Sequence, residues 1–141
     1  MLVFGEGEHL VELGDELRLL DSYLFLVETR FGDTVRVTTE ISEDARSYSI
    51  VPLTLQMLLE NALKHNVASE EHPLDIRIEV TGGPSLVFHN NIQRKSASRS
   101  TQLGLKNIND SYRFVAGEGL DIQETPTRFS VKLPLLQLAS A

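Results

Sequence analysis

The spacing of apolar residues along the chain predicts three helices. From Leu10 to Phe31 these residues recur at alternating steps of three and four, which is the heptad seam of an amphipathic helix that ends at Gly32. Two later segments repeat this spacing, and the second helix is predicted to begin at Pro52, a residue that the first turn of a helix tolerates. The predicted helices cover residues 9–30, 52–66 and 104–117.

The heptad seam of the first helix has two interpretations. Its apolar positions can pair with a second copy of the chain, giving a homodimer through the helix at 10–31, or they can pack on the sheet of the same domain. Three heptads are the minimum for a coiled-coil assignment, so the sequence leaves both interpretations open. The seam consists of Leu10, Leu13, Leu17, Leu20, Leu24, Val27 and Phe31.

Alternation of apolar and polar residues predicts strands at 35–41, 48–50, 74–80, 85–89, 120–123 and 128–133. The turn residues Gly82-Gly83-Pro84 and Thr125-Pro126 join the last four strands as two hairpins. Hairpins that alternate with helices predict an α+β fold. We expect a two-layer α/β sandwich in which helices cover one face of a mixed or mostly antiparallel sheet.

The composition excludes several classes of protein. A chain of 141 residues suits one domain with a single core. Because it has no cysteine, it has no disulfide, no thiolate zinc site and no cysteine nucleophile. It has no basic-then-apolar leader and no apolar run near the roughly 18 residues of a membrane span, so we expect neither a signal peptide nor a span in these residues. The net charge of −7 argues against a nucleic-acid partner.

The charge is distributed unevenly. Residues 1–50 carry 11 acidic and 4 basic side chains, whereas residues 51–141 carry 9 of each. The basic side chains between 93 and 113 face a single acid, Asp110, and the segment 90–103 has no apolar period. A loop of that length is usually functional or disordered. It is either a solvated basic loop or a site for a polyanionic small molecule.

The second predicted helix contains a polar cluster made of Glu60, Asn61, Lys64 and His65. Asn61 and His65 are four residues apart and share a face, as do Glu60 and Lys64. One interpretation is a helix rim with an intrahelical Glu60–Lys64 pair. The other is a ligand site, because an amide beside apolar residues needs partners that a metal ion with bound phosphate supplies.

Three stretches in order carry a family resemblance. VPLTLQMLLENALKHN at 51–66 resembles the asparagine-containing box of sensor histidine kinases, in particular of the LytS/YehU-like branch. DELRLLDSYLFLVETRFGD at 15–33 is similar to the helix before the ATP-binding domain of that branch. LGLKNINDSYRFVAG at 103–117 is similar to the Gly-Leu-x-Asn motif after the ATP lid, and FSVKLPL at 129–135 resembles the closing strand.

The resemblance implies the Bergerat (GHKL) ATP-binding fold, with ATP and Mg²⁺ as cofactors. It divides the chain into the end of a dimerisation or linker helix at 1–31 and an ATP-binding domain at 32–141. By position, it implies that Asn61 is the magnesium ligand, that Glu60 flanks it at the catalytic centre, and that Asn90 replaces the adenine-binding aspartate. The other implied ATP-binding residues are Lys64, His65, Gly104, Leu105 and Asn107, and the implied lid residues are Arg94, Lys95 and Arg99.

The sequence departs from the family pattern beside the implied base site. Where the family has Asp-x-Gly-x-Gly, this chain has Asn90, Ile92 and Arg94, and Gln102 replaces another glycine. An asparagine oxygen still accepts a hydrogen bond from the adenine amino group, but without the charge of a carboxylate. The missing glycines remove backbone freedom beside the base.

The phosphoacceptor histidine of the family lies in a Pro-His-Phe-type motif, and none of His9, His65, His72 and His89 has that context. We therefore interpret the chain as the ATP-binding catalytic domain of a two-component sensor kinase whose acceptor histidine lies outside these residues. It is expected not to phosphorylate itself. The implied partners are the acceptor helix of the parent kinase and a response regulator. The implied location is cytoplasmic, in a parent anchored in the bacterial inner membrane.

Two other functions stay open. Related ATP hydrolases place a carboxylate one turn before the magnesium-binding asparagine, where this chain has Met57, so hydrolysis is disfavoured. A degenerate nucleotide-binding or dimerisation module without kinase activity is favoured by the missing glycines. Titration with Mg-ATP distinguishes this module from a kinase domain.

Overall fold

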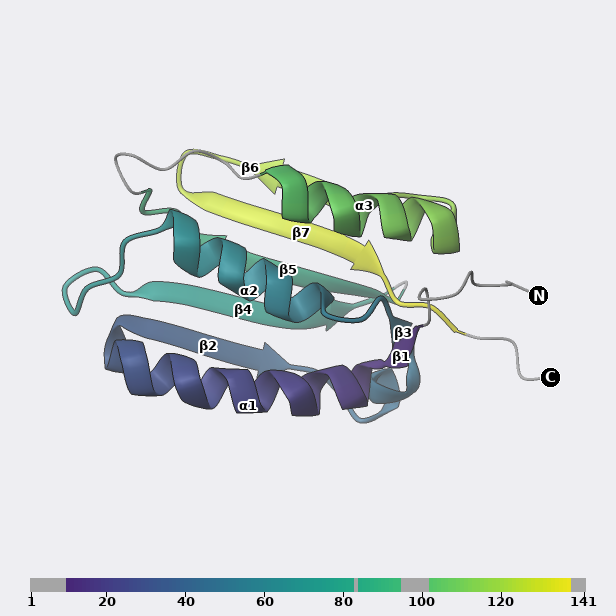
Figure 1. The fold of residues 1–141 in the computed structure, drawn as a ribbon, viewed down its shortest axis with the longest axis horizontal. Coiled ribbons are helices and arrows are strands. Elements are labelled where there is room, and N and C mark those ends of the chain that lie inside the picture. Colours follow the sequence, from purple (N-terminus) through teal and green to yellow (C-terminus); the bar gives the residue numbers. More distant parts are fainter. Residues whose placement is uncertain (1–9, 83, 95–101, 138–141) are drawn as a thin grey trace.

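A five-stranded sheet and three helices form the two layers of the molecule (Figure 1). The computed structural model describes residues 10–82, 84–94 and 102–137, with side chains from 105 onward in the last segment. The helices are α1 (Leu13–Phe31), α2 (Thr54–His65) and α3 (Gln102–Ala116), with short 3-10 helices at Gly32–Thr34 and Asp44–Ser47. The strands are β1 (Val11–Glu12), β2 (Val35–Glu40), β3 (Ser49–Ile50), β4 (Leu74–Thr81), β5 (Ser85–Asn91), β6 (Asp121–Glu124) and β7 (Arg128–Pro134).

The main sheet is mixed and is covered by helices on one face, as predicted. Its strand order is β2-β4-β5-β7-β6, with β2 parallel to β4 and the other neighbours antiparallel. The hairpins β4–β5 and β6–β7 are those expected from the turn residues. The helices α1, α2 and α3 lie side by side over the same face of this sheet (Figure 1).

The core lies between the two layers because one side of each central strand is apolar. In β4 the alternate residues Leu74, Ile76 and Ile78 are fully buried, and β5 continues the pattern with Leu86 and Phe88. The heptad seam of α1 joins the same core through Leu13, Leu17, Leu20 and Val27. The seam therefore packs on its own domain rather than on a second chain, and α1 shares one core with the strands that follow it.

Each of the three helices begins at a residue other than the one predicted from the sequence. The first helix begins at Leu13 rather than at residue 9, because Val11 and Glu12 pair with β3 as a short antiparallel ladder. The second begins after Pro52, since Leu53 has a left-handed φ of 66° that breaks the helical path. The third begins at Gln102, two residues before Gly104.

The buried carboxylate of Glu16 joins α1 to the start of α2. Its side chain is 5% exposed, and its two oxygens accept hydrogen bonds from the backbone N–H groups of Leu53 at 3.0 Å and Leu55 at 3.2 Å. Burial raises the pKa of Glu16, while the bonds from these N–H groups oppose the rise. Because Leu53 offers no capping side chain, Glu16 satisfies the first turn of α2 from another helix.

The hydroxyl of Tyr112 attaches α3 to the same place. It accepts a hydrogen bond from the N–H of Val51 at 3.2 Å, and burial raises the pKa of this fully buried phenol. The position of α2 is thus fixed at its start by one polar side chain from each neighbouring helix.

Candidate functional site

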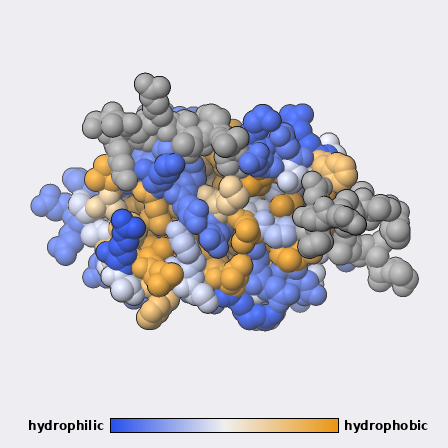
Figure 2. Space-filling model, in the orientation of Figure 1, coloured by the Kyte–Doolittle hydropathy of each residue, from blue (hydrophilic) through white to orange (hydrophobic). Residues whose placement is uncertain are grey.

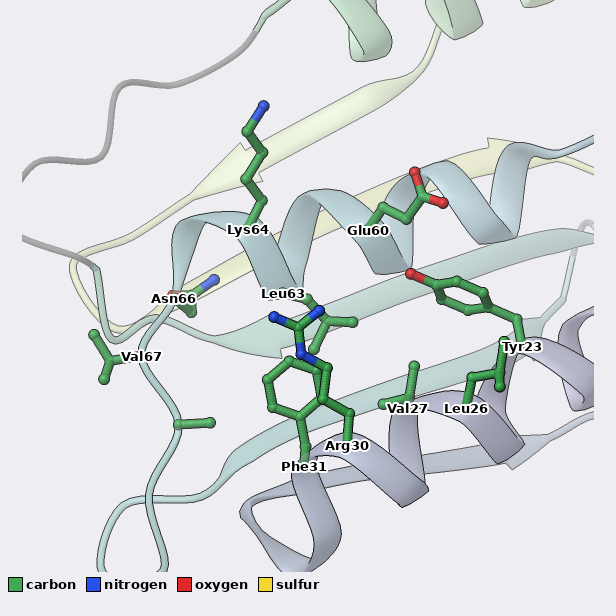
Figure 3. Close-up of a pocket in the computed structure, with 11 residues that line it drawn as sticks. Tyr23, Leu26, Val27, Arg30, Phe31, Glu60, Leu63, Lys64, Asn66 and Val67 are labelled. Atoms are coloured by element: carbon green, nitrogen blue, oxygen red, sulfur yellow. The ribbon is translucent and has the colours of Figure 1, made fainter.

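The helix α2 separates two hollows of different character. The polar cavity, of about 120 Å³, lies between α2, β5, α3 and the β6–β7 hairpin. The apolar groove, of about 550 Å³, lies between α2 and α1 (Figure 3). The polar cavity is lined by Asn61, Ala62, His65, Asn66, Asn90, Ile92, Arg94, Leu105, Ile122, Glu124 and Phe129.

An unsatisfied buried acceptor marks the polar cavity. Asn90 is 2% exposed, and its Nδ2 donates to the backbone oxygen of Asn91 at 2.8 Å. Within the described residues its Oδ1 has no hydrogen-bond partner. Leaving a buried acceptor without a donor costs about 1–3 kcal/mol, and buried polar atoms are usually paired. The cavity is therefore suited to a ligand that brings a donor to Asn90.

The face of α2 toward the polar cavity carries Asn61 and His65, as their four-residue spacing predicts. Asn61 is half-buried and His65 is buried. Asn66, which follows the helix, donates through Nδ2 to the oxygen of Ala62 at 2.9 Å and accepts through Oδ1 from the N–H of Gln93 at 2.7 Å. These bonds hold the end of α2 to the segment after β5.

The other two members of the polar cluster lie on the opposite flank of α2. Glu60 and Lys64 line the apolar groove, not the polar cavity. Glu60 accepts a hydrogen bond from Nε2 of Gln56 at 3.1 Å, and no ion pair joins it to Lys64 among the described residues. The Lys64 side chain extends from α2 away from α1 in Figure 3.

The remaining residues implied by the resemblance are spread around the cavity mouth. Arg94 lines the cavity and forms an ion pair with Glu124 of β6 at 2.5 Å. Leu105 also lines the cavity, Gly104 lies within α3, and Asn107 is exposed on α3 outside the lining. The predicted lid residues Lys95 and Arg99 lie outside the described residues.

Sequence reasoning missed three residues that hold the ends of α2 in place: Glu16, Asn66 and Gln93. Each acts through bonds to backbone groups that are distant in sequence, which apolar spacing does not register. Gln93, for example, donates through Nε2 to two backbone oxygens, those of Val67 at 3.1 Å and His72 at 2.9 Å. The available signal was a polar residue beside a buried position, as for Glu16 between Leu13 and Leu20.

The described part of the chain contains no helix long and apolar enough to cross a membrane. Among the same residues, no cluster of three or more histidine, aspartate and glutamate side chains has the arrangement of a metal site.

Comparisons with known sequences give partial matches. No protein-family model matches the chain. An uncharacterized protein of Bacillus subtilis, YwpD, is 30% identical over an alignment of 138 positions, which covers 88% of this chain and 49% of YwpD. The sensor protein kinase HptS of Staphylococcus aureus is 41% identical over 75 residues, or 53% of this chain and 14% of HptS. The chain thus spans half or less of the length of these relatives.

Solved structures match nearly the whole chain. The cytoplasmic segment of histidine kinase QseC superposes with a TM-score of 0.60 at 13% identity, covering 94% of this chain and 80% of that one. A nucleotide-free catalytic domain of histidine kinase ThkA gives a TM-score of 0.60 at 12% identity, covering 92% and 96%. The fold is that of a histidine kinase catalytic domain. A mycobacterial sensor histidine kinase, MprB, agrees with a TM-score of 0.58 at 15% identity, covering 93% and 99%.

The polar cavity is lined by several of the residues that the sequence resemblance implied for an ATP-binding site. The sequence resemblance had assigned Asn90 and Asn61 to one site, and the structure brings both to the same cavity with His65 and Leu105. It does not bring Glu60 and Lys64 there.

Proposed function

We propose that this domain binds Mg-ATP in the polar cavity and serves as the catalytic domain of a two-component sensor histidine kinase. The observation that carries the proposal is the buried Oδ1 of Asn90, an acceptor without a donor inside a cavity of this fold. The exocyclic amino group of adenine is a donor of the required kind. An adenine ring also suits the apolar part of the lining, which includes Ala62, Ile92, Leu105 and Phe129.

The cavity accommodates a base rather than a whole nucleotide. Pockets for drug-sized ligands have volumes of about 300–1,000 Å³, and this cavity has about 120 Å³. The ribose and phosphates would therefore extend beyond it, past Asn61 and His65. The start of α3 near Gly104 offers backbone N–H groups and a helix dipole to an anion.

The residues present fit a magnesium ion that arrives with the nucleotide. Mg²⁺ prefers oxygen ligands and is usually held by one or two protein groups together with substrate phosphates. The Asn61 side chain supplies such an oxygen on the cavity face of α2. When bound, the ion would neutralise charge on the transferring phosphoryl group.

Transfer of the γ-phosphoryl group to a protein acceptor is favoured over hydrolysis. The position one turn before Asn61 is Met57, which cannot activate water, and Glu60 faces the apolar groove. The carboxylate at the cavity mouth, Glu124, is engaged by Arg94. What this chain supplies is positioning and electrostatic stabilisation, which are the main requirements of phosphoryl transfer.

The finer assignments are part of the same proposal. The order of the three sequence motifs supports the LytS/YehU-like branch, and the match to a sensor protein kinase supports a two-component role. We assign the acceptor histidine to a helix of the parent kinase outside residues 1–141, with α1 at the end of the connecting segment. A response regulator would receive the phosphoryl group, on the cytoplasmic side of a membrane-anchored parent.

Calorimetric titration with Mg-ATP tests binding, and radiolabelled ATP tests transfer. The chain of 141 residues should bind Mg-ATP and remain unlabelled, because none of its histidines has an acceptor context. A longer form that includes the upstream acceptor helix should gain an acid-labile label. Absence of binding would favour the degenerate module. Steady release of inorganic phosphate by the short chain would favour the hydrolase.

A further inference from the structure

The apolar groove between α1 and α2 has the size and the lining of a small-molecule site. Its volume of about 550 Å³ falls within the range of about 300–1,000 Å³ that is typical of pockets for drug-sized ligands. Two of its apolar side chains, Leu26 and Val67, are 62% and 50% exposed. Figure 2 shows hydrophobic side chains gathered on this face, over α1 and α2. Leu26 and Val67 stay in contact with water unless a ligand covers them.

A cation without an ion pair lies at one end of the groove. Arg30 is exposed, and its guanidinium lies 5.3 Å from the centre of the Phe31 ring. Among the described residues, neither Arg30 nor Lys64 forms an ion pair. In Figure 3 the Arg30 guanidinium points from α1 toward Leu63 of α2, whereas Lys64 extends away from α1. Arg30 is therefore the cation placed to meet a ligand in the groove.

The other end of the groove carries the opposite charge. Tyr23 and Glu60 line this end, and Tyr23 points toward α2 in Figure 3. Because positions 23 and 30 are two helical turns apart, the groove runs for about 10 Å along α1 between them. A negatively charged group is attracted by Arg30 and repelled by Glu60. The groove is thus polarised along its length, with an apolar stretch between the two charges.

We propose that the apolar groove binds a small carboxylic acid with an apolar chain. The carboxylate would lie on the Arg30 guanidinium, whose planar N–H donors match a carboxylate in two parallel hydrogen bonds. The chain would extend along Leu26 and Leu63 toward Tyr23 and remove these side chains from water. Glu60 disfavours the reversed orientation, because it would bring two carboxylates together.

This site is separate from the proposed nucleotide site. The apolar groove and the polar cavity lie on opposite flanks of α2, and within the described residues their linings share Asn66 alone. The Asn66 amide is bonded to the oxygen of Ala62 and the N–H of Gln93, so it forms a wall between the two hollows. We therefore expect the acid and Mg-ATP to bind at the same time, and the acid site does not depend on the proposed function.

Calorimetric titration with octanoate, below the concentration at which it forms micelles, tests the site. The chain of 141 residues should bind octanoate at one site, both without nucleotide and with saturating Mg-ATP. Octyltrimethylammonium has the same chain and a cationic head, and it should bind at least about tenfold more weakly. Propionate, which lacks the chain, should show no binding. Equal affinities for the two octyl compounds would contradict the role of Arg30.

Paired variants locate the bound acid. Leu26→Glu should abolish octanoate binding because it places a carboxylate in the groove. Leu19→Glu is the matched control, since Leu19 is 50% exposed on α1 and lies outside the groove lining. Arg30→Gln should weaken binding by about fivefold. Arg18→Gln, which removes a cation that pairs with Asp15 outside the groove, should leave it unchanged. Thermal unfolding without ligand checks that each variant remains folded.

Three results would overturn the proposal. The first is a folded wild-type chain that does not bind octanoate. The second is binding that survives in Leu26→Glu or is lost in Leu19→Glu, because octanoate would then occupy another surface. The third concerns a membrane of anionic lipids, which offers the same combination of charge and apolar chains. A chain that binds phosphatidylglycerol vesicles but not octanoate would have a membrane-binding surface in place of a site for a free acid.

Discussion

The two hollows beside α2 differ in the side chains that line them and in the kind of contact that those side chains leave unmade. The apolar groove is the larger, at about 550 Å³, yet its walls carry exposed hydrophobic side chains such as Leu26 and Val67. The polar cavity is smaller, at about 120 Å³, and contains the unpaired Oδ1 of Asn90. A groove of exposed apolar residues calls for a surface to cover it, whereas a buried acceptor calls for a specific donor. Volume alone would favour the apolar groove, whereas the unpaired acceptor favours the polar cavity as the nucleotide site that we propose.

A single helix supplies one wall to each hollow. Since successive residues of a helix are about 100° apart, Asn61 and His65 face the cavity while Glu60 and Lys64 face the groove. Any shift or rotation of α2 would change both hollows together. The polar bonds that hold its start therefore affect both hollows.

Removal of the Glu16 carboxylate should have the largest effect on stability. Glu16→Ala leaves the N–H groups of Leu53 and Leu55 without their acceptor inside the protein. We expect the free energy of unfolding to fall by about 3 kcal/mol, measured by urea denaturation. Asp21→Ala, an exposed change on the same helix, should stay within about 0.5 kcal/mol. Equal effects of the two substitutions would show that Glu16 does not hold α2.

The pH dependence of stability identifies the same carboxylate. Because burial raises the pKa of Glu16 in the folded state, the native chain binds more protons than the unfolded chain between the ordinary and the raised value. Its contribution to stability therefore decreases as pH rises through that interval. Glu16→Gln cannot titrate, so the wild-type stability minus that of Glu16→Gln should decrease over the interval. An increase would contradict the direction of the pKa shift.

Substitution on the cavity face of α2 should remove the effect of nucleotide. At 100 times its dissociation constant a ligand stabilises the native state by about 2.7 kcal/mol. We expect Asn61→Ala to lose most of this gain, measured by denaturation with and without Mg-ATP. Val67→Ser, in the apolar groove, should retain it. If Mg-ATP stabilises Asn61→Ala as much as the wild type, Asn61 is not the magnesium ligand.

The orientation of the Asn90 amide predicts which base is accepted. Its Nδ2 is held by the oxygen of Asn91, so Oδ1 is the atom left to accept a hydrogen bond from a bound base. Adenine offers an amino group there, whereas guanine offers another acceptor. We expect Mg-ATP to bind at least about tenfold more tightly than Mg-GTP by calorimetry. Asn90→Asp should keep this preference and Asn90→Leu should lose it. Equal affinities in the wild type would mean that the base does not contact Asn90.

The sequence predicted the elements that depend on residues close together along the chain. The alternation in β4 and the heptad seam of α1 are direct consequences of facing one core, so periodicity revealed them. The antiparallel hairpins followed from their turns. The parallel pairing of β2 with β4 was not specified by any local pattern, because the two strands are separated by α2.

Part of the candidate site was predictable from helix geometry, and part from the family resemblance, which placed Asn90 in the same site as Asn61. The spacing of Asn61 and His65 placed both on one face, and the structure puts both in the polar cavity. The family resemblance grouped Glu60 and Lys64 with them, although both line the groove. The bond from Glu16 spans 37 residues, and no spacing rule connects positions so far apart.

The smallest expected effect concerns the ion pair at the cavity mouth. Arg94 and Glu124 are 43% and 51% exposed, so their pairing should contribute less than about 1 kcal/mol to stability. Their effects on nucleotide affinity should instead have opposite signs. Arg94→Gln removes a cation beside the proposed phosphate path and should weaken Mg-ATP binding. Glu124→Gln releases Arg94 and removes a negative charge, so it should strengthen binding. We expect changes of about twofold to fivefold by calorimetry at low ionic strength, diminishing as salt is added. Weaker binding in both variants would indicate that the intact pair shapes the mouth and that Arg94 does not serve the phosphates.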